Sequence, residues 1–235
     1  MIGRELKRIL QKPTAFVCIV VYMGIMILGV ESDLRARYEI GFLNLFWVTE
    51  NFGVTIFIQT LIFPVAAAGN YFDERKGHYD WLIQMRSGQL RYCIAKIVSA
   101  VLGGIILYMI SVILFFAVCV IFIPEVRHGS TVESITNLFQ SKECFWYRMA
   151  LSIGYYPTVI VLAFQYSLHI GIYVLLGLCV SVFCTNRYVF YAMPFLLTRI
   201  GMYIGGFVGL YAYIPYGREP VSYTHLRAHE TCADL

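Results

Sequence analysis

The sequence predicts an all-α, polytopic membrane protein. The prediction depends on three observations: charged residues are scarce, several apolar stretches are long enough to span a bilayer, and the charges gather between those stretches. Of the 235 residues, 59% are hydrophobic and 14% are charged, and the mean hydropathy is +0.69. Soluble domains carry about 25% charged residues. The charges present are too few to cover a globule of this size, so we expect the chain to lie in lipid.

Five apolar stretches account for most of the chain. A helix needs about 20 apolar residues to cross a hydrocarbon core of about 30 Å. The stretches that meet this requirement are residues 14–30, 52–72, 97–123, 158–184 and 188–211. We expect one transmembrane domain over residues 1–220, with external loops at 31–51 and 124–157 and a short helix within 141–156.

Lysine and arginine predict the orientation, because cytoplasmic loops are enriched in both. One side would hold Arg4, Lys7, Arg8, Lys12, Arg75, Lys76, Arg86, Arg91, Lys96 and Arg187. The other side would hold Arg35, Arg37, Arg127, Lys142 and Arg148, with Arg218 near the end. The richer side should be cytoplasmic. We therefore expect a multi-pass protein of the cell membrane with a cytoplasmic N-terminus.

The N-terminal residues 2–12 form an amphipathic pattern. Ile2, Leu6 and Ile9 fall on one helical face, and basic residues surround it. This pattern is typical of an interfacial helix on a leaflet with anionic headgroups. The alternative is an ordinary basic flank of the first span without a separate helix.

Residues 221–235 differ abruptly in composition from everything before them. Residues 221–231, VSYTHLRAHET, resemble the translation of a transposase adapter used in preparing DNA libraries. We therefore expect a non-native tail and exclude its pair His225 and His229 from any metal assignment. A native sixth span would then be missing.

The stretch NYFDERKGHYDWLIQMRSGQLRYCIAK, residues 70–96, concentrates charge between the second and third spans. A short amphipathic helix over 79–86 would present aromatic and aliphatic anchors to headgroups or to another protein at the inner surface. An apolar face with a charged rim suits the groove of a partner. The alternative is a charged loop that only enforces topology.

Polar residues also occur inside the predicted spans, where they are costly and are candidate functional positions. In one set, Asn51, Thr55 and Gln59 recur every four residues. Gln165 and His169 have the same spacing, and Arg199 lies near mid-depth in the fifth span. They could line a substrate route or an interface between two subunits. They could instead hydrogen-bond to one another and hold the bundle together. Glu50 is a conceivable partner for Arg199.

Catalytic signatures are absent from the sequence. It contains no G-x-x-x-x-G-K-[ST] phosphate loop, no H-E-x-x-H and no G-x-S-x-G. We expect no catalytic residue, no metal site, no cofactor on this chain and no nucleic-acid partner.

The charged stretch resembles the first cytoplasmic loop of ABC-2 type transporter permeases. The positions that carry this resemblance are Phe72, Glu74, Gly77, Leu82, Arg86, Ser87, Tyr92 and Lys96. A second resemblance lies in LGLCVSVFCTNRYVFYAMPFLL, where Gly177, Asn186, Arg187 and Pro194 match a glycine-bearing span, a tight turn and a proline-bearing span. The order of these motifs covers residues 2–214. The chain departs from the family pattern because it lacks both the sixth span and the re-entrant outer segment that precedes it.

The resemblance implies a six-span bundle, of which five spans are present, and a coupling helix at 79–86 that docks on a separate ATPase subunit. Its ATPase-coupling residues would be Glu74, Tyr79, Trp81, Leu82, Ile83 and Arg86. ATP and magnesium would bind to that partner, and a second permease copy would complete a homo- or heterodimer. Two other classes remain open: a non-transporting membrane protein that recruits a cytoplasmic partner through residues 73–96, and an integral membrane enzyme.

Overall fold

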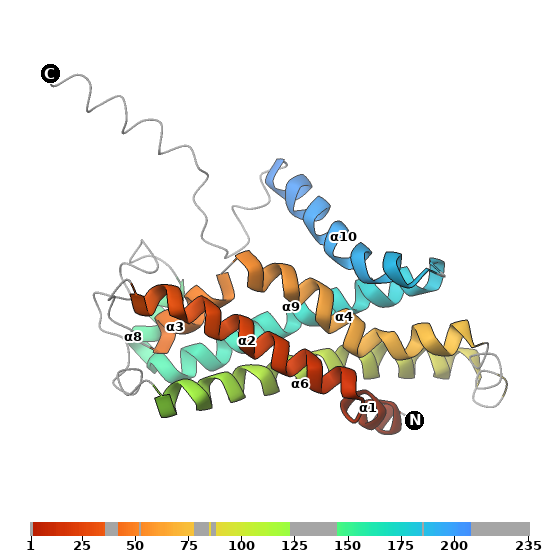
Figure 1. Ribbon diagram of the computed structural model, residues 1–235, viewed down its shortest axis with the longest axis horizontal. Coiled ribbons are helices and arrows are strands. Elements are labelled where there is room, and N and C mark those ends of the chain that lie inside the picture. Colours follow the sequence, from red (N-terminus) through yellow and green to blue (C-terminus); the bar gives the residue numbers. More distant parts are fainter. Residues whose placement is uncertain are drawn as a thin grey trace, which may run out of the picture. The chain divides into compact units, whose positions relative to one another are not determined.

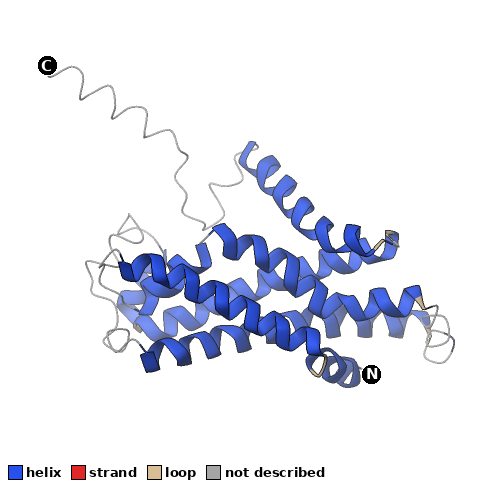
Figure 2. Cartoon of the chain, viewed as in Figure 1, coloured by secondary structure: helices blue, strands red, loops and turns tan. Residues whose placement is uncertain are grey.

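The computed structural model consists of helices and short turns throughout the part of the chain that it describes (Figures 1 and 2). The described residues are 2–35, 42–51, 53–77, 85, 88–122, 145–184 and 186–207. Four of the helices are long and apolar enough to cross a membrane. The prediction of an all-α polytopic membrane protein is confirmed.

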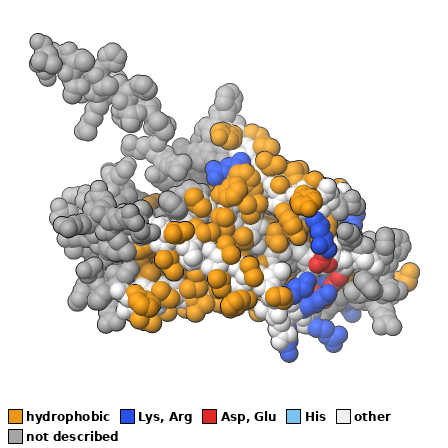
Figure 3. Space-filling view, viewed as in Figure 1, with side chains coloured by type: hydrophobic (Ala, Val, Ile, Leu, Met, Phe, Trp, Pro, Cys, Tyr) orange, Lys and Arg blue, Asp and Glu red, His pale blue; other side chains and the backbone are white. Residues whose placement is uncertain are grey.

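The four candidate spans are α2 (Pro13–Arg35), α4 (Gly53–Lys76), α6 (Gln89–Phe122) and α9 (Tyr155–Phe183). Helix α9 packs against both α4 and α6, and α2 packs against the same two helices. All four lie in one compact unit, residues Met1–Thr198. Their outward faces carry exposed apolar side chains such as Phe16, Ile113 and Phe164, and apolar atoms cover most of the described face in Figure 3. Such faces are suited to lipid.

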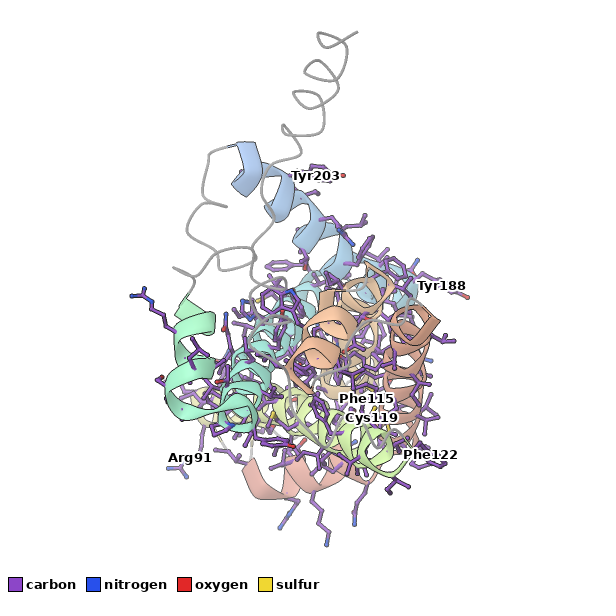
Figure 4. The ribbon with its side chains drawn as sticks, turned by 90° about the vertical axis from the view of Figure 1, so that its left-hand side faces the viewer. Arg91, Phe115, Cys119, Phe122, Tyr188 and Tyr203 are labelled. Carbon is purple, nitrogen blue, oxygen red and sulfur yellow. The ribbon has the colours of Figure 1, made fainter. Side chains whose placement is uncertain are left out.

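Small residues let the spans approach one another closely. A Cβ added at Gly104 of α6 would lie 2.6 Å from Cγ2 of Val174 on α9, and one added at Gly177 would lie 2.9 Å from Cβ of Pro64 on α4. Where lipid removes the hydrophobic drive between helices, close packing of this kind supplies much of the attraction. Larger side chains fill the rest of the interior. Phe115 and Cys119 of α6 lie within the bundle, whereas Phe122 points away from it (Figure 4).

Hydroxyl groups inside the spans bond to their own helices. Ser111, Ser167 and Ser181 each donate to a backbone carbonyl three or four residues earlier, at 2.6–2.8 Å. This local bond satisfies a serine at membrane depth without a partner from another helix. These residues are therefore compatible with apolar surroundings.

Four shorter helices complete the described chain. They are α1 (Ile2–Leu10), α3 (Phe42–Asn51), α8 (Phe145–Ile153) and α10 (Arg187–Phe207). Gly154 has a φ of 103° between α8 and α9, a conformation that favours glycine. Oδ1 of Asn186 accepts a hydrogen bond of 2.9 Å from the backbone N–H of Tyr188, so it caps the N-terminus of α10.

Helix α10 is not among the four helices that meet the length and hydropathy requirement for a span. It contains Arg187, Pro194 and Arg199 within 21 residues. Its first part, to Thr198, belongs to the first compact unit, and Arg199–Leu235 forms a second. The fifth membrane crossing remains a prediction, and the tail at 221–235 lies outside the described residues.

Two helices differ from the sequence predictions. Helix α6 begins at Gln89 rather than at residue 97, because the charge of Lys96 is paired with acidic side chains and does not end the buried segment. Helix α3 occupies residues predicted as an external loop. Its ten residues are too few to span a bilayer, yet it buries Leu43, Leu45 and Phe46.

Replacing Gly104 by alanine should lower the melting temperature of the purified protein in lipid nanodiscs. The new methyl group would displace Val174, a stiff β-branched side chain that is fully buried, at a cost of about 1–3 kcal/mol. The matched control is Gly24→Ala, where no atom lies within 4 Å. The control should be neutral or stabilising by up to about 1 kcal/mol. Equal stability of the two variants would refute the close α6–α9 packing.

Candidate functional site

Two glutamates are almost completely buried in the bundle, and each has a different set of partners. Glu74, near the end of α4, is 5% exposed, and Glu50, near the end of α3, is fully buried. A buried carboxylate needs partners that compensate for the loss of water. The two glutamates therefore mark the places where the apolar bundle is organised by polar contacts.

Glu74 lies at the centre of an ionic cluster that joins three helices. Nζ of Lys96 on α6 lies 2.8 Å from Oε2 of Glu74 and 2.5 Å from Oε2 of Glu5 on α1. Nη1 of Arg8 on α1 also donates to Glu74, and Oη of Tyr92 donates to Oε2 of Glu74 at 3.2 Å. We call Glu5, Arg8, Glu74, Tyr92 and Lys96 the ion cluster. Its two cations and two carboxylates balance, which is the condition for charges to be buried together.

The sequence shows why these side chains meet. Lys96 and Tyr92 are four residues apart on α6 and so share a face, on which both are buried. The amphipathic α1 places Glu5 and Arg8 three residues apart, again on one face, with Ile9 buried beside them. Ile9 packs on α6, where its Cγ2 lies 3.1 Å from the position of a Cβ added at Gly103.

Further contacts tie the same end of α4 to neighbouring segments. Asp73 pairs with Arg187 at 3.1 Å and with Lys12 at 3.8 Å. The guanidinium of Arg75 donates to the carbonyl of Ser181 at 2.7 Å and to that of Val182. These carbonyls belong to the last turn of α9, where backbone acceptors lack helical partners. Figure 3 shows basic and acidic side chains gathered at one end of the apolar surface.

Glu50 is bound by neutral donors only, in the contacts that the structure describes. Its Oε1 accepts hydrogen bonds from Oη of Tyr22 on α2 at 2.7 Å and from Oη of Tyr108 on α6 at 2.9 Å. Its Oε2 accepts from Nε2 of Gln59 on α4 at 2.6 Å, and the same Nε2 donates to Oη of Tyr22 at 2.6 Å. We call these four residues the Glu50 network. It draws α2, α3, α4 and α6 together.

The two polar sites lie at different levels of the bundle. Lys96 and Tyr108 are both on α6, twelve residues apart in the printed sequence. At about 1.5 Å per residue, they are separated by about 18 Å along the helix axis. The ion cluster is therefore near one end of the bundle, and the Glu50 network is well inside it.

Of the predicted coupling residues, the structure describes only Glu74. Tyr79, Trp81, Leu82, Ile83 and Arg86 lie outside the described residues. The carboxylate of Glu74 is engaged within the chain by Arg8 and Lys96. In this arrangement, Glu74 organises the helix ends next to the predicted coupling segment.

The predicted intramembrane polar residues fall into separate places. Thr55 and Gln59 share a buried face of α4, but Asn51 ends α3 and belongs to a different helix. The hydroxyl of Thr55 is buried without a hydrogen-bond partner. Among the side chains of this set that the structure describes, Gln59 enters the Glu50 network.

The remaining members of that set lie on α9 and α10. Gln165 and His169 are half-buried on α9, and Nδ1 of His169 donates to the carbonyl of Gln165 at 2.9 Å. Arg199 lies on α10, in the second compact unit. In the part of the chain that the structure describes, no group of three His, Cys, Asp or Glu side chains could hold a metal ion.

Sequence reasoning missed the Glu50 network. It considered Glu50 only as a partner for Arg199 and did not consider Tyr22 or Tyr108. The available signal was a glutamate directly before a long apolar stretch, together with tyrosines at the centres of two predicted spans. Buried hydroxyls of this kind need an acceptor.

Comparison with known proteins gave no relative: no protein-family model, curated protein or solved structure matches this chain.

Replacing Lys96 by methionine should destabilise the protein by about 3 kcal/mol, because it leaves two carboxylates beside one arginine. Adding Glu74→Gln restores the balance of charge, so the double variant should unfold at a higher temperature than Lys96→Met alone. Thermal unfolding of the protein in nanodiscs measures both effects. Lys7→Met, at an exposed position of α1, serves as the control and should change stability by less than about 0.5 kcal/mol. A double variant less stable than the single one would contradict the ion cluster.

Proposed function

We propose that this chain is the permease subunit of an ABC exporter, which moves a substrate across the cell membrane with ATP hydrolysed by a separate subunit. The resemblance of residues 70–96 and of the segment around Asn186 to ABC-2 permeases supports this proposal. So does the set of candidate spans. The observation that carries it most directly is the ion cluster beside the predicted coupling segment.

The ion cluster provides a mechanical reason for a coupling helix at this place. The segment 77–88 connects α4 to α6, and Glu74 and Lys96 pair across the ends of those two helices. Arg8 and Glu5 add α1 to the same pair. A force applied to residues 79–86 would therefore move three helices together and would not simply bend a loop.

In this proposal, Trp81, Leu82 and Ile83 are the apolar anchors that enter a cleft of the ATPase, and Tyr79 and Arg86 lie at its rim. Closure of the ATPase dimer would push the coupling helix over residues 79–86, and the bundle would change between inward- and outward-facing states. Such coupling between two sites requires two arrangements of the connecting element. A second permease copy, identical or related, would complete the transport path.

The ion cluster also fits a second function, a membrane protein that recruits a cytoplasmic partner without transport. A rigid base for the segment 77–88 would help either activity. The two differ in their dependence on ATP. A partner ATPase that lacks its catalytic glutamate would still bind this chain under either function. Its loss of ATP hydrolysis would abolish export if the chain is a transporter, and it would leave recruitment unchanged if the chain only recruits a partner.

Changing Trp81 and Leu82 to aspartate together should reduce co-purification of the partner ATPase by at least about tenfold. Buried interface anchors of this size contribute about 2 kcal/mol each. The matched control is Leu90→Asp, an exposed position in the first turn of α6, where an acidic residue is favourable. Retention of the ATPase by the Trp81/Leu82 variant would overturn the assignment of the coupling helix.

The orientation can be tested at Cys93, an exposed cysteine on the second turn of α6. In a variant whose other cysteines are replaced by serine or alanine, a membrane-impermeant maleimide should label Cys93 only after the cells are permeabilised. Labelling in intact cells would place the ion cluster and the coupling segment outside the cell.

A further inference from the structure

The Glu50 network is the largest buried polar group that the proposed function does not use. Both carboxyl oxygens of Glu50 accept hydrogen bonds, and the donors that the structure describes there belong to neutral side chains. None of the ion pairs in the described part of the chain involves Glu50. A charged carboxylate in this position is compensated by dipoles alone, whereas Glu74 has two cations.

The donors around Glu50 are arranged for its charged form. The hydroxyls of Tyr22 and Tyr108 donate to Oε1, and Nε2 of Gln59 uses one proton for Oε2 and the other for Oη of Tyr22. A protonated carboxyl would bring a fourth donor into this arrangement. Gln59 can accept it, because an amide that turns over exchanges its NH₂ for an oxygen at the same place.

The polar atoms of the Glu50 network leave no space between them for a larger ligand. Its oxygen and nitrogen atoms are already 2.6–2.9 Å apart, at direct hydrogen-bond distances. A metal ion or an amine would have to separate these pairs. A proton can be added to Glu50 without moving heavy atoms, apart from the rotation of one amide.

We propose that Glu50 is a proton-binding site, at which the carboxylate takes up one proton from water to become a carboxylic acid and Gln59 turns its amide oxygen to accept that proton. The reaction adds one proton and breaks no covalent bond. In the charged form, Gln59 donates to Oε2 of Glu50. In the neutral form, the carboxyl group of Glu50 donates to the amide oxygen of Gln59. The change also removes the second donor bond of Gln59, the one to Tyr22.

Among the residues that the structure describes, the other titratable groups around Glu50 are phenols. Tyr22 faces it from α2 and Tyr108 from α6, and the ring of Tyr166 on α9 packs 5.8 Å from that of Phe46, one turn before Glu50 on α3. Gln59 is the polar group that faces it from α4. Phenols lose their protons only at about pH 10. Below that pH, a change of charge in the network therefore belongs to Glu50.

Proton uptake would alter how α4 is held against α2. Glu50 connects α3 to α2, α4 and α6, so the loss of the Gln59–Tyr22 bond loosens the contact between α4 and α2 at this level. The inference is independent of the proposed transport function, since it concerns only the isolated chain. It can therefore fail while the ATPase partnership holds, and the reverse is also true.

Infrared difference spectroscopy of the full chain in nanodiscs, titrated from about pH 4 to about pH 9, tests the proposal, because a protonated carboxyl has its own C=O band. Exposed carboxyls also titrate at the acidic end of this range, so the relevant signal is the difference between the wild type and Glu50→Gln. We expect that difference to be a band that titrates as one group per chain. Gln59→Leu removes a hydrogen bond from both forms of Glu50, but the bond to the charged form is the stronger one. The substitution should therefore move the midpoint to higher pH by about one unit. Ser111→Ala, whose hydroxyl bonds only to its own helix in the described contacts, is the control and should leave the midpoint unchanged.

Titration curves of the C=O band that are identical in the wild type and Glu50→Gln would overturn the proposal, as would a Glu50-dependent band of constant intensity over the whole range. If Glu50→Gln does not fold, Tyr108→Phe removes one donor and keeps the ring, and it must also move the midpoint upward. A midpoint that stays the same in both Tyr108→Phe and Gln59→Leu would equally reject Glu50 as the site.

Discussion

The ion pair between Lys96 and Glu74 is the constraint on which the end of this bundle depends. In a chain with only 14% charged residues, burying either side chain alone would be prohibitive. Together with Glu5 and Arg8 they form a balanced group, so the charges can be placed between helices instead of at their ends. As a result, α6 is one continuous helix from Gln89 through Lys96 to Phe122, and α1 has a specific place to bind.

The two buried glutamates show two ways of keeping a carboxyl group inside an apolar bundle. Glu74 is compensated by the cations of Arg8 and Lys96, which makes its contacts structural. Glu50 is compensated by two phenols and an amide, which can accept either protonation state at a modest cost. The ion-paired arrangement of Glu74 suits a connection between helices that transmits force. The neutral donors around Glu50 suit a group whose charge changes. This difference is why we assign them to different roles.

The sequence was sufficient to predict four helices of membrane-spanning length and the amphipathic α1, because hydropathy and helical periodicity are local properties. The fifth span stays a prediction. Apolar runs of about 20 residues leave little choice in a bilayer. The polar sites depend on contacts between distant residues: Arg8 meets Glu74 across 66 positions and Lys96 meets Glu5 across 91. Helix α3 was missed for a related reason. Its ten residues are too short to read as a span, and they become helical where Phe46 and Glu50 find partners on other helices.

The central claim is that α1 is docked on α6 at the ion cluster, and a cross-link tests it most directly. A Cβ added at Gly103 lies 3.7 Å from Cβ of Ile9, within the range that a disulfide requires. In a chain whose native cysteines are replaced, Ile9→Cys with Gly103→Cys should form an intramolecular disulfide under mild oxidation. The pair Gly3→Cys with Gly103→Cys should not, because Gly3 has no atom within 4 Å of its Cβ position. A disulfide in the first pair supports the docked helix; failure of that pair to cross-link in folded protein would contradict the account.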